Sequence, residues 1–159
     1  MTDLATIAPA FVEMAHRIVW CTVATTAVDG TPRTRVLHPI WEWDGTTLTG
    51  WIATSPQSPK AADLAAQPRV SLTYWATNHD TCTADCDTAW ETTDEERAAG
   101  WDRYANGPAP VGYDPSIIPP WTGPTAPAFG ILRLMPLRLR VMPGSVLLAG
   151  QGDTLTWRA

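Results

Sequence analysis

The first segment of the chain has the hydrophobic period of a helix, and the segments after it have the features of strands. Over residues 3–17 apolar side chains recur every three or four positions, at Phe11, Met14 and Ile18, which predicts a short amphipathic helix. After that point β-branched and aromatic residues dominate and Asp-Gly pairs interrupt them, as is typical of antiparallel strands. The predicted strands are 19–27, 33–43, 47–54, 69–76, 80–90 and 129–142, followed by two short β pieces at 145–148 and 154–157.

Turn signals suggest how the first strands are connected. Asp29-Gly30 and Asp44-Gly45 join the first three strands, and Asp-Gly is a strong hairpin signal, so we expect an antiparallel meander there. Pro39 should bend the second strand and Pro136 should break the sixth, because proline cannot donate to a strand ladder.

Two helical segments and one long loop complete the pattern. Lys60 opens a short helix that Pro68 ends, and Thr93 with Glu96 forms a capping box for a helix reaching about Tyr104. Residues 106–127 contain seven prolines and are expected to form a long ordered loop. Six or more strands with few helices predict a mainly β protein, built as a small closed or half-closed barrel.

Composition excludes several classes of function. The chain has 159 residues, a net charge of −5 and only eleven scattered Lys and Arg, which does not fit nucleic-acid binding. No segment approaches the ~20 apolar residues of a membrane span, and the first residues lack the order of a secretion signal. Three cysteines, an odd number, fit the reducing cytoplasm better than a disulfide framework.

The stretch 33–75 carries a recognisable arrangement of residues. It combines Arg33 and Arg35 on one strand, Thr54 at the end of the next, a loop in which Ser58 precedes Lys60 by two positions, and a helix ending at Gln67-Pro68. This arrangement resembles the core of the pyridoxamine 5′-phosphate oxidase-like split barrels. That superfamily includes FMN enzymes and actinobacterial enzymes that use the deazaflavin coenzyme F-420.

The resemblance implies a fold and an assembly. It implies a six-stranded antiparallel Greek-key split barrel with short flanking helices, paired into a homodimer with the cofactor at the interface. We therefore expect one domain over 1–159. Its expected parts are an N-terminal helix (1–18), barrel strands with the cofactor loop (19–91), a helix with the Pro-rich loop (92–128) and C-terminal strands (129–159).

The resemblance also implies a cofactor site. The implied cofactor-binding residues are Arg33, Arg35, Val36, Leu37, Thr54, Ser55, Ser58, Lys60 and Trp75. Two features depart from the pyridoxamine phosphate oxidases: Pro59 stands where an arginine often precedes the lysine, and their carboxy-terminal substrate-binding tail is not evident.

Physical reasoning independently favours an anion near these residues. Arg33 and Arg35 are two apart on a strand and share a face, where their charges repel unless an anion or acidic side chains lie between them. Lys60 lies in a first helical turn, where the helix dipole disfavours a cation unless an anion is bound. The alternatives are a solvated outer strand face and an ordinary surface lysine.

Other candidate residues have plainer interpretations. Cys82 and Cys86 fall on one strand face and are expected to be core residues rather than metal ligands. His38, beside Pro39, is either a general acid or base or a histidine hydrogen-bonded at a strand bend. We expect Trp41, Trp43, Trp51 and Trp75 to pack in the core, with one of them touching a ring-shaped ligand.

These observations favour an oxidoreductase. The expected reaction is hydride transfer between bound FMN or coenzyme F-420 and a small unsaturated or conjugated substrate, with no catalytic residue identified in the chain. The expected partners are a small-molecule substrate and a second copy of the chain, with no nucleic acid and no membrane. Alternatives are a non-catalytic cofactor-binding or haem-sequestering module and, from the cysteines, a zinc-stabilised interaction domain.

Overall fold

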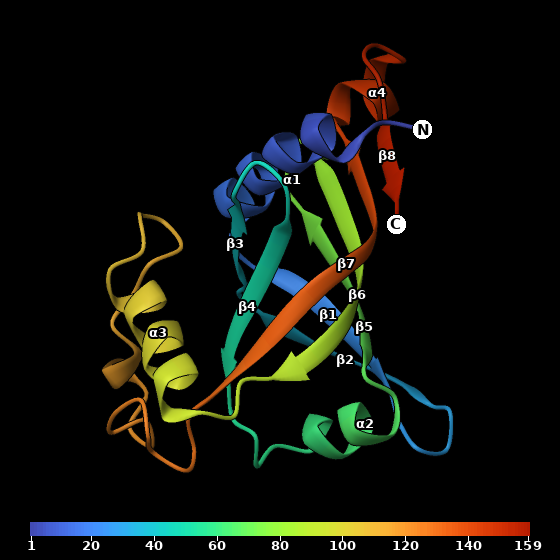
Figure 1. Ribbon diagram of the computed structural model, residues 1–159. Coiled ribbons are helices and arrows are strands. Elements are labelled where there is room, and N and C mark those ends of the chain that lie inside the picture. Colours follow the sequence, from blue (N-terminus) through green and yellow to red (C-terminus); the bar gives the residue numbers. More distant parts are fainter.

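The computed structural model describes residues 1–159, and its centre is one eight-stranded antiparallel sheet rolled into a split barrel (Figure 1). The strands are β1 (Cys21–Thr26), β2 (Pro32–Leu37), β3 (Ile40–Trp43), β4 (Leu48–Thr54), β5 (Arg69–Trp75), β6 (Thr81–Trp90), β7 (Gly130–Met142) and β8 (Leu155–Arg158). The helices are α1 (Leu4–Ile18), α2 (Lys60–Ala66), α3 (Asp94–Ala105) and α4 (Gly144–Ala149), with a short 3-10 turn at Pro115–Ile117. The prediction of a mainly β split barrel is confirmed. The sheet has eight strands rather than six because the predicted second strand is divided and the short C-terminal piece predicted at 154–157 also joins the sheet.

The predicted meander is wrong, and Pro39 is the reason. Both Asp-Gly turns form hairpins, β1 with β2 and β3 with β4. The chain leaves β2 at Leu37 and enters β3 only at Ile40, because proline has no N–H for the ladder and restricts the residue before it. The two halves therefore separate and become the two ends of the strand order β2-β1-β5-β6-β7-β4-β3.

At Pro136 the predicted break is a bulge. Strand β7 continues through this residue and pairs with β6 along its length. Asp85 pairs with Arg138 and the next residue, Cys86, pairs with Pro136, so Leu137 is an extra residue in β7. A bulge allows the strand to bend while its hydrogen bonding continues on both sides.

The C-terminal segment confirms one prediction and corrects another. The piece at 154–157 is strand β8, which pairs with β7. The piece at 145–148 is helix α4 instead, begun by Pro143 and ended by Gly150 in the left-handed conformation. Proline before a helix and a left-handed glycine after it are helix boundary signals, which outweigh the β-branched content of so short a stretch.

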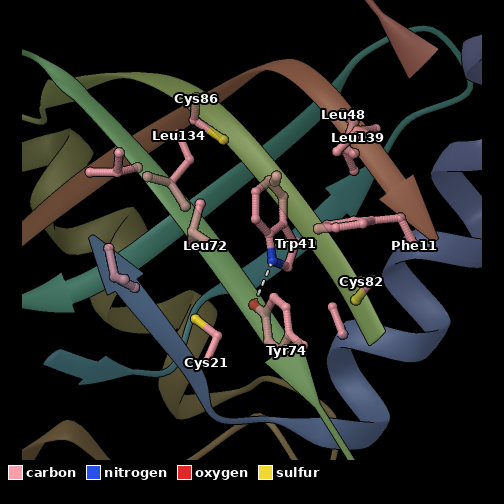
Figure 2. Packing of buried hydrophobic residues seen from close by; sticks show 14 of the residues in the cluster. Phe11, Cys21, Trp41, Leu48, Leu72, Tyr74, Cys82, Cys86, Leu134 and Leu139 are labelled. Atoms are coloured by element: carbon pink, nitrogen blue, oxygen red, sulfur yellow. Dashed lines mark hydrogen bonds between the residues drawn. The ribbon is translucent and has the colours of Figure 1, made fainter. Parts of the chain in front are cut away.

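Alternating side chains of the strands fill the barrel. Residues of β5 alternate strictly between exposed and buried, and Leu72 and Tyr74 are fully buried. Cys82 and Cys86 lie buried in the same core, which confirms their prediction as core residues. At the centre the Trp41 Nε1–H donates a hydrogen bond of 2.9 Å to the Tyr74 hydroxyl, as Figure 2 shows.

Helix α1 covers one end of the barrel, and α2 lies at the other (Figure 1). The buried face of α1 includes Phe11, whose ring meets the Trp41 ring edge to face at a centroid distance of 5.0 Å. His16 Nε2 accepts the backbone N–H of Trp41 at 2.9 Å, which ties the helix to β3. No helix is long and apolar enough to cross a membrane.

A second, smaller cluster holds the Pro-rich loop against the outside of the barrel. Its buried members are Ile40, Tyr104, Val111, Trp121, Ala126, Phe129 and Ile131. The Tyr104 hydroxyl accepts the N–H of Ala53 at 3.1 Å and lies 2.8 Å from the carbonyl oxygens of His38 and Trp51. Helix α3 packs closely because Gly100 has no side chain, and a Cβ there would lie 2.3 Å from Ile131 Cγ1.

Candidate functional site

An apolar cavity of about 470 Å³ opens between the barrel and the Pro-rich loop. The barrel side and the residues before β1 contribute Val19, Trp20, Val36, Leu37, His38, Ala53 and Thr54. The loop contributes Pro110, Tyr113, Ile117, Ile118 and Trp121. Concave, mostly apolar cavities of this size with a few polar groups are the usual form of small-molecule sites.

Three of the predicted cofactor-binding residues line this cavity. Val36 and Leu37 are the last residues of β2, and Thr54 is the last residue of β4. The ends of both strands meet here because the chain turns away at His38-Pro39 on one side and at Ser55 on the other. The structure thus brings together residues that lie 17 or more positions apart in the sequence.

His38 stands at the strand bend and is held on several sides. Its Nε2 lies 2.6 Å from the carbonyl oxygen of Val111, and its ring contacts those of Trp20, Tyr104 and Tyr113 at centroid distances of 5.1–5.6 Å. Burial lowers the pKa of His38, so the imidazole is neutral near pH 7. A carbonyl oxygen only accepts, so Nε2 carries the proton and Nδ1 is left as an acceptor.

The two arginines of β2 share an acidic partner from α2. Arg33 Nη1 lies 3.3 Å from one carboxylate oxygen of Asp63, and Arg35 Nη2 lies 3.9 Å from the other. Asp63 is buried, and it also accepts a hydrogen bond from the Thr25 hydroxyl at 2.9 Å. Part of the repulsion between the arginines is therefore relieved by a side chain of the protein itself, one of the alternatives that the sequence left open.

Lys60 adds a third positive charge next to Arg35. Its Nζ donates to the Ser58 hydroxyl at 2.7 Å, and that hydroxyl donates to the Ser55 carbonyl oxygen at 2.7 Å. Burial lowers the pKa of Lys60, and the nearby charge of Arg35 lowers it further. Lys60 forms no ion pair, and the one carboxylate paired with Arg33 and Arg35 is that of Asp63, so these four side chains together carry a net positive charge.

This cationic group and the apolar cavity are neighbours. Arg35 and Leu37 lie on the same face of β2, two residues and therefore about 7 Å apart along the strand. Thr54 lines the cavity and leads directly into the loop that carries Ser55 and Ser58. This layout matches a ligand with a planar apolar part and an anionic end. A flavin phosphate has that shape and that charge.

Trp75 is the one predicted residue placed elsewhere. It lies on the outer face of β5, its side chain is 55% exposed, and its ring packs near His79 rather than in the cavity. Val36, although it borders the cavity, is also 62% exposed on the outer face.

Sequence reasoning missed the loop wall of the cavity and Asp63. Tyr113, Ile118 and Trp121 come from a segment without hydrophobic period, so only folding reveals that they share a site. For Asp63 a signal existed: it lies three residues after Lys60 in the same helix, where it can face both arginines. The structure contains no group of three or more His, Cys, Asp or Glu side chains that could hold a metal ion.

The fold is a split barrel in which an apolar cavity lies beside a group of positively charged side chains, and comparison with known proteins identifies the family. The family model for pyridoxamine 5′-phosphate oxidase matches residues 7–142. The chain belongs to this family. No curated protein matches the chain.

Solved structures with the same fold bind different cofactors. A pyridoxamine 5′-phosphate oxidase-related, FMN-binding protein from Nostoc punctiforme is 14% identical with a TM-score of 0.66, over 100% of this chain and 97% of that chain. A haem-binding protein from Mycobacterium smegmatis is 17% identical with a TM-score of 0.61, over 99% of this chain and 59% of that one. An F-420 reductase is 13% identical with a TM-score of 0.56, and the match covers 81% of this chain and 94% of that chain.

Proposed function

We propose that this protein is an oxidoreductase that binds FMN or coenzyme F-420 and transfers a hydride between that cofactor and a small unsaturated or conjugated molecule. The observation that carries the proposal is the continuity of a positive cradle with an apolar cavity. The cradle consists of Arg33, Arg35, Ser58 and Lys60, with Thr54 and Ser55 at its border. Flavin- and F-420-binding proteins of the same fold support the choice of cofactor.

The cradle suits a phosphate for electrostatic reasons. Lys60 is half-buried beside Arg35 without a carboxylate of its own, and an anion bound there would offset both charges. Arginine can bind a phosphate through two hydrogen bonds, while lysine acts as a point charge. Charge-assisted hydrogen bonds of this kind contribute about 1.5–3 kcal/mol each.

The cavity suits the planar ring of the cofactor and its substrate. Val36, Leu37 and Trp121 provide apolar surface, and burial of a ring there would exclude water from the reacting atoms. The bound cofactor supplies the redox chemistry, and the chain's own residues bind it, orient it and shield it. A nucleophile or acid pair in the protein is not required for this role.

The exposed apolar outer face supports a homodimer. Trp20, Val36 and Trp75 are 55–62% exposed. Val36 pairs with Thr22, which pairs with Thr73, two residues from Trp75, so the outer side of β1, β2 and β5 carries a continuous surface. Trp75 would then reach the cofactor of the partner copy. Light scattering at micromolar concentration should give a dimer mass, and a monomer that still binds cofactor tightly would rule out an interfacial site.

Three free cysteines, all buried, are consistent with the cytoplasm as the location of the protein.

A direct test compares FMN with riboflavin, which has the same ring and no phosphate. Lys60→Ala should weaken FMN binding roughly 10- to 100-fold and riboflavin binding little, as fluorescence titration would measure. Arg69→Ala is the matched control, because Arg69 pairs with Asp87 away from the cradle. Added salt should weaken FMN binding to the parent more than to the variant. If Lys60→Ala, Arg33→Ala and Arg35→Ala all bind FMN and F-420 as the parent does, the cradle is not the phosphate site.

Haem sequestration is the second candidate, supported by the haem-binding protein of the same fold. His38 is the histidine at the cavity, but its Nε2 is engaged by Val111 and its ring is packed among aromatic rings. Visible spectra of the purified protein before and after addition of FMN, F-420 and haem separate the candidates. A haem spectrum that is lost in His38→Ala would favour sequestration over hydride transfer.

A further inference from the structure

A second cavity, of about 270 Å³, lies on the outer side of the barrel between helix α3 and strands β4 and β7. Its walls are formed by Thr49 and Trp51 of β4, Glu91, Arg133 of β7, and Glu96, Ala99 and Arg103 of α3. Trp51 and Arg133 are partners in the β4–β7 ladder, and the three helical residues share one face of α3 because they are spaced by three and four positions. None of these residues lines the first cavity or belongs to the cradle.

Arg133 lies in this cavity with its Nε unused. This nitrogen is buried and forms no hydrogen bond, although Glu91 Oε1 is only 3.5 Å away. It is the one buried side-chain nitrogen or oxygen atom of the protein without a hydrogen-bond partner. Because buried polar groups are nearly always hydrogen-bonded, this exception indicates that the ion pair between Arg133 and Glu91 is open rather than closed. The outer end of the guanidinium remains accessible, since 42% of the side chain is exposed.

Glu91 faces Arg133 as the buried carboxylate of the cavity. Its side chain is 9% exposed and receives no hydrogen bond from an N–H or hydroxyl group of the chain. Burial raises the pKa of Glu91 against the opposing charge of Arg133, and the nearby Glu96 raises it further. Glu96 is itself fixed, because its Oε2 accepts the backbone N–H groups of Thr92 and Thr93 at 3.1 Å each. A positively charged group bound here would offset both carboxylates.

Arg103 is held in place by two contacts that leave its outer donors free. Its guanidinium carbon lies 3.6 Å from the centroid of the Trp51 ring, a cation–π contact, and its Nε donates to Glu42 Oε1 at 2.8 Å. Nε is the only atom of this guanidinium that donates a hydrogen bond within the chain. A planar guanidinium fixed in this way, with free Nη groups, is suited to bind a carboxylate.

Four charged side chains, two of each sign, restrict what can bind in the cavity. They are Glu91, Glu96, Arg103 and Arg133. A simple anion would be attracted by the arginines and repelled by the two carboxylates, and a simple cation would meet the reverse. A molecule that carries both charges on separate atoms can place each charge beside its opposite. The cavity is slightly smaller than the about 300–1,000 Å³ typical of small-molecule sites, which limits such a molecule to roughly the size of one amino acid.

We propose that this cavity is a second ligand site and that its ligand is a zwitterion, an α-amino acid. The carboxylate of the ligand binds the guanidinium groups of Arg103 and Arg133, and its ammonium group binds Glu91. The site goes beyond the redox function and does not depend on it, because its walls share no residue with the cradle or the first cavity. The alternative is a cluster of ion pairs that binds only water.

A thermal-shift screen of the standard L-amino acids identifies the ligand. A compound that binds only the folded protein raises its Tm, so at least one amino acid should do so at about 10 mM. Calorimetric titration then compares that amino acid with its amide, which lacks the negative charge, and with its deaminated acid, which lacks the positive charge. We expect each of the two derivatives to bind at least about tenfold more weakly than the amino acid.

Two conservative variants test the two ends of the site separately. Arg133→Lys keeps a positive charge beside Glu91 but loses the planar fork, and it should weaken amino-acid binding about tenfold. Glu91→Gln keeps the shape and removes the negative charge, so it should weaken the amino acid and tighten the deaminated acid. Arg138→Lys is the matched control, because Arg138 belongs to the same strand and pairs with Asp85 outside the cavity. Circular dichroism shows whether each variant is folded, and if Arg133→Lys is not, Glu91→Gln alone decides.

The outcomes separate this site from the proposed cofactor site. FMN affinity, measured by flavin fluorescence, should be the same in the parent and in all three variants. No binding of any standard amino acid, equal binding of the amide or the deaminated acid, or binding that is unchanged in both cavity variants overturns the proposal. Absence of FMN and F-420 binding overturns the proposed function, and the amino-acid titrations remain decisive for the second site.

Discussion

The two hydrophobic clusters of this protein are built in opposite ways. The barrel cluster has 21 buried residues, drawn mostly from strands that alternate between buried and exposed positions, together with one face of α1. The loop cluster has seven, drawn from the ends of elements and from a proline-rich segment with no hydrophobic period. The first cluster holds the fold together, and the second shapes the wall of the cavity. Stability and specificity therefore depend largely on different residues.

The strongest test of this difference is a substitution that affects the barrel cluster alone. Leu72→Ala removes a fully buried side chain of β5 and should lower the free energy of unfolding by about 2–5 kcal/mol. Denaturant titration measures the loss, and Leu148→Ala, at a 66% exposed position, should stay within about 0.5 kcal/mol of the parent. Cofactor affinity per folded molecule should not change, and a large change would show that the two clusters are coupled.

A smaller and more local effect is expected in the loop cluster. Tyr104→Phe removes the hydroxyl that accepts the Ala53 N–H and approaches two carbonyl oxygens, so buried polar groups lose a partner. The loss should be about 1–3 kcal/mol. Hydrogen exchange should rise in residues 106–127 and at Ala53, while β5 stays protected. Unchanged protection of the loop would contradict the role of Tyr104 as its anchor.

The smallest effect should appear on acidification. The folded-state pKa of His16 lies below the ordinary value of 6.5, first because of burial and second because of the nearby His38, and its Nε2 accepts the Trp41 N–H. The unfolded chain therefore binds the proton more readily, so stability falls as the pH drops below about 6.5. Thermal melts from pH 7.5 to 5 should show this slope. His16→Gln, which keeps an acceptor and does not titrate, should reduce it, and an unchanged slope would assign the effect to His38.

The same contrast explains what sequence reasoning could and could not predict. Most strand positions, the capping box at Thr93 and the core role of Cys82 and Cys86 depend on local pattern and were predicted correctly, whereas the strand predicted at 33–43 is two strands and the one at 145–148 is a helix. The order of strands was not, because the consequence of Pro39 depends on which strands are available as partners. Val36, Leu37 and Thr54 were placed by resemblance, and they line the cavity. Its loop wall, with Tyr113 and Trp121, follows only from long-range packing that has no periodic signal.

The separation of β2 from β3 has a consequence for the order in which the protein is made. The two hairpins follow each other in the chain, but within the sheet β5, β6 and β7 lie between them. Besides β3, strand β4 pairs with residues 130–134 of β7. On the ribosome, the first 54 residues therefore emerge as two hairpins that cannot complete a sheet until most of the chain is synthesised. Until then the apolar face of β4, with Leu48 and Ile52, has an open edge that is prone to wrong pairing. Nascent chains that stop before residue 130 should therefore leave this edge unpaired, whereas chains that extend past residue 142 contain the whole of its partner strand β7.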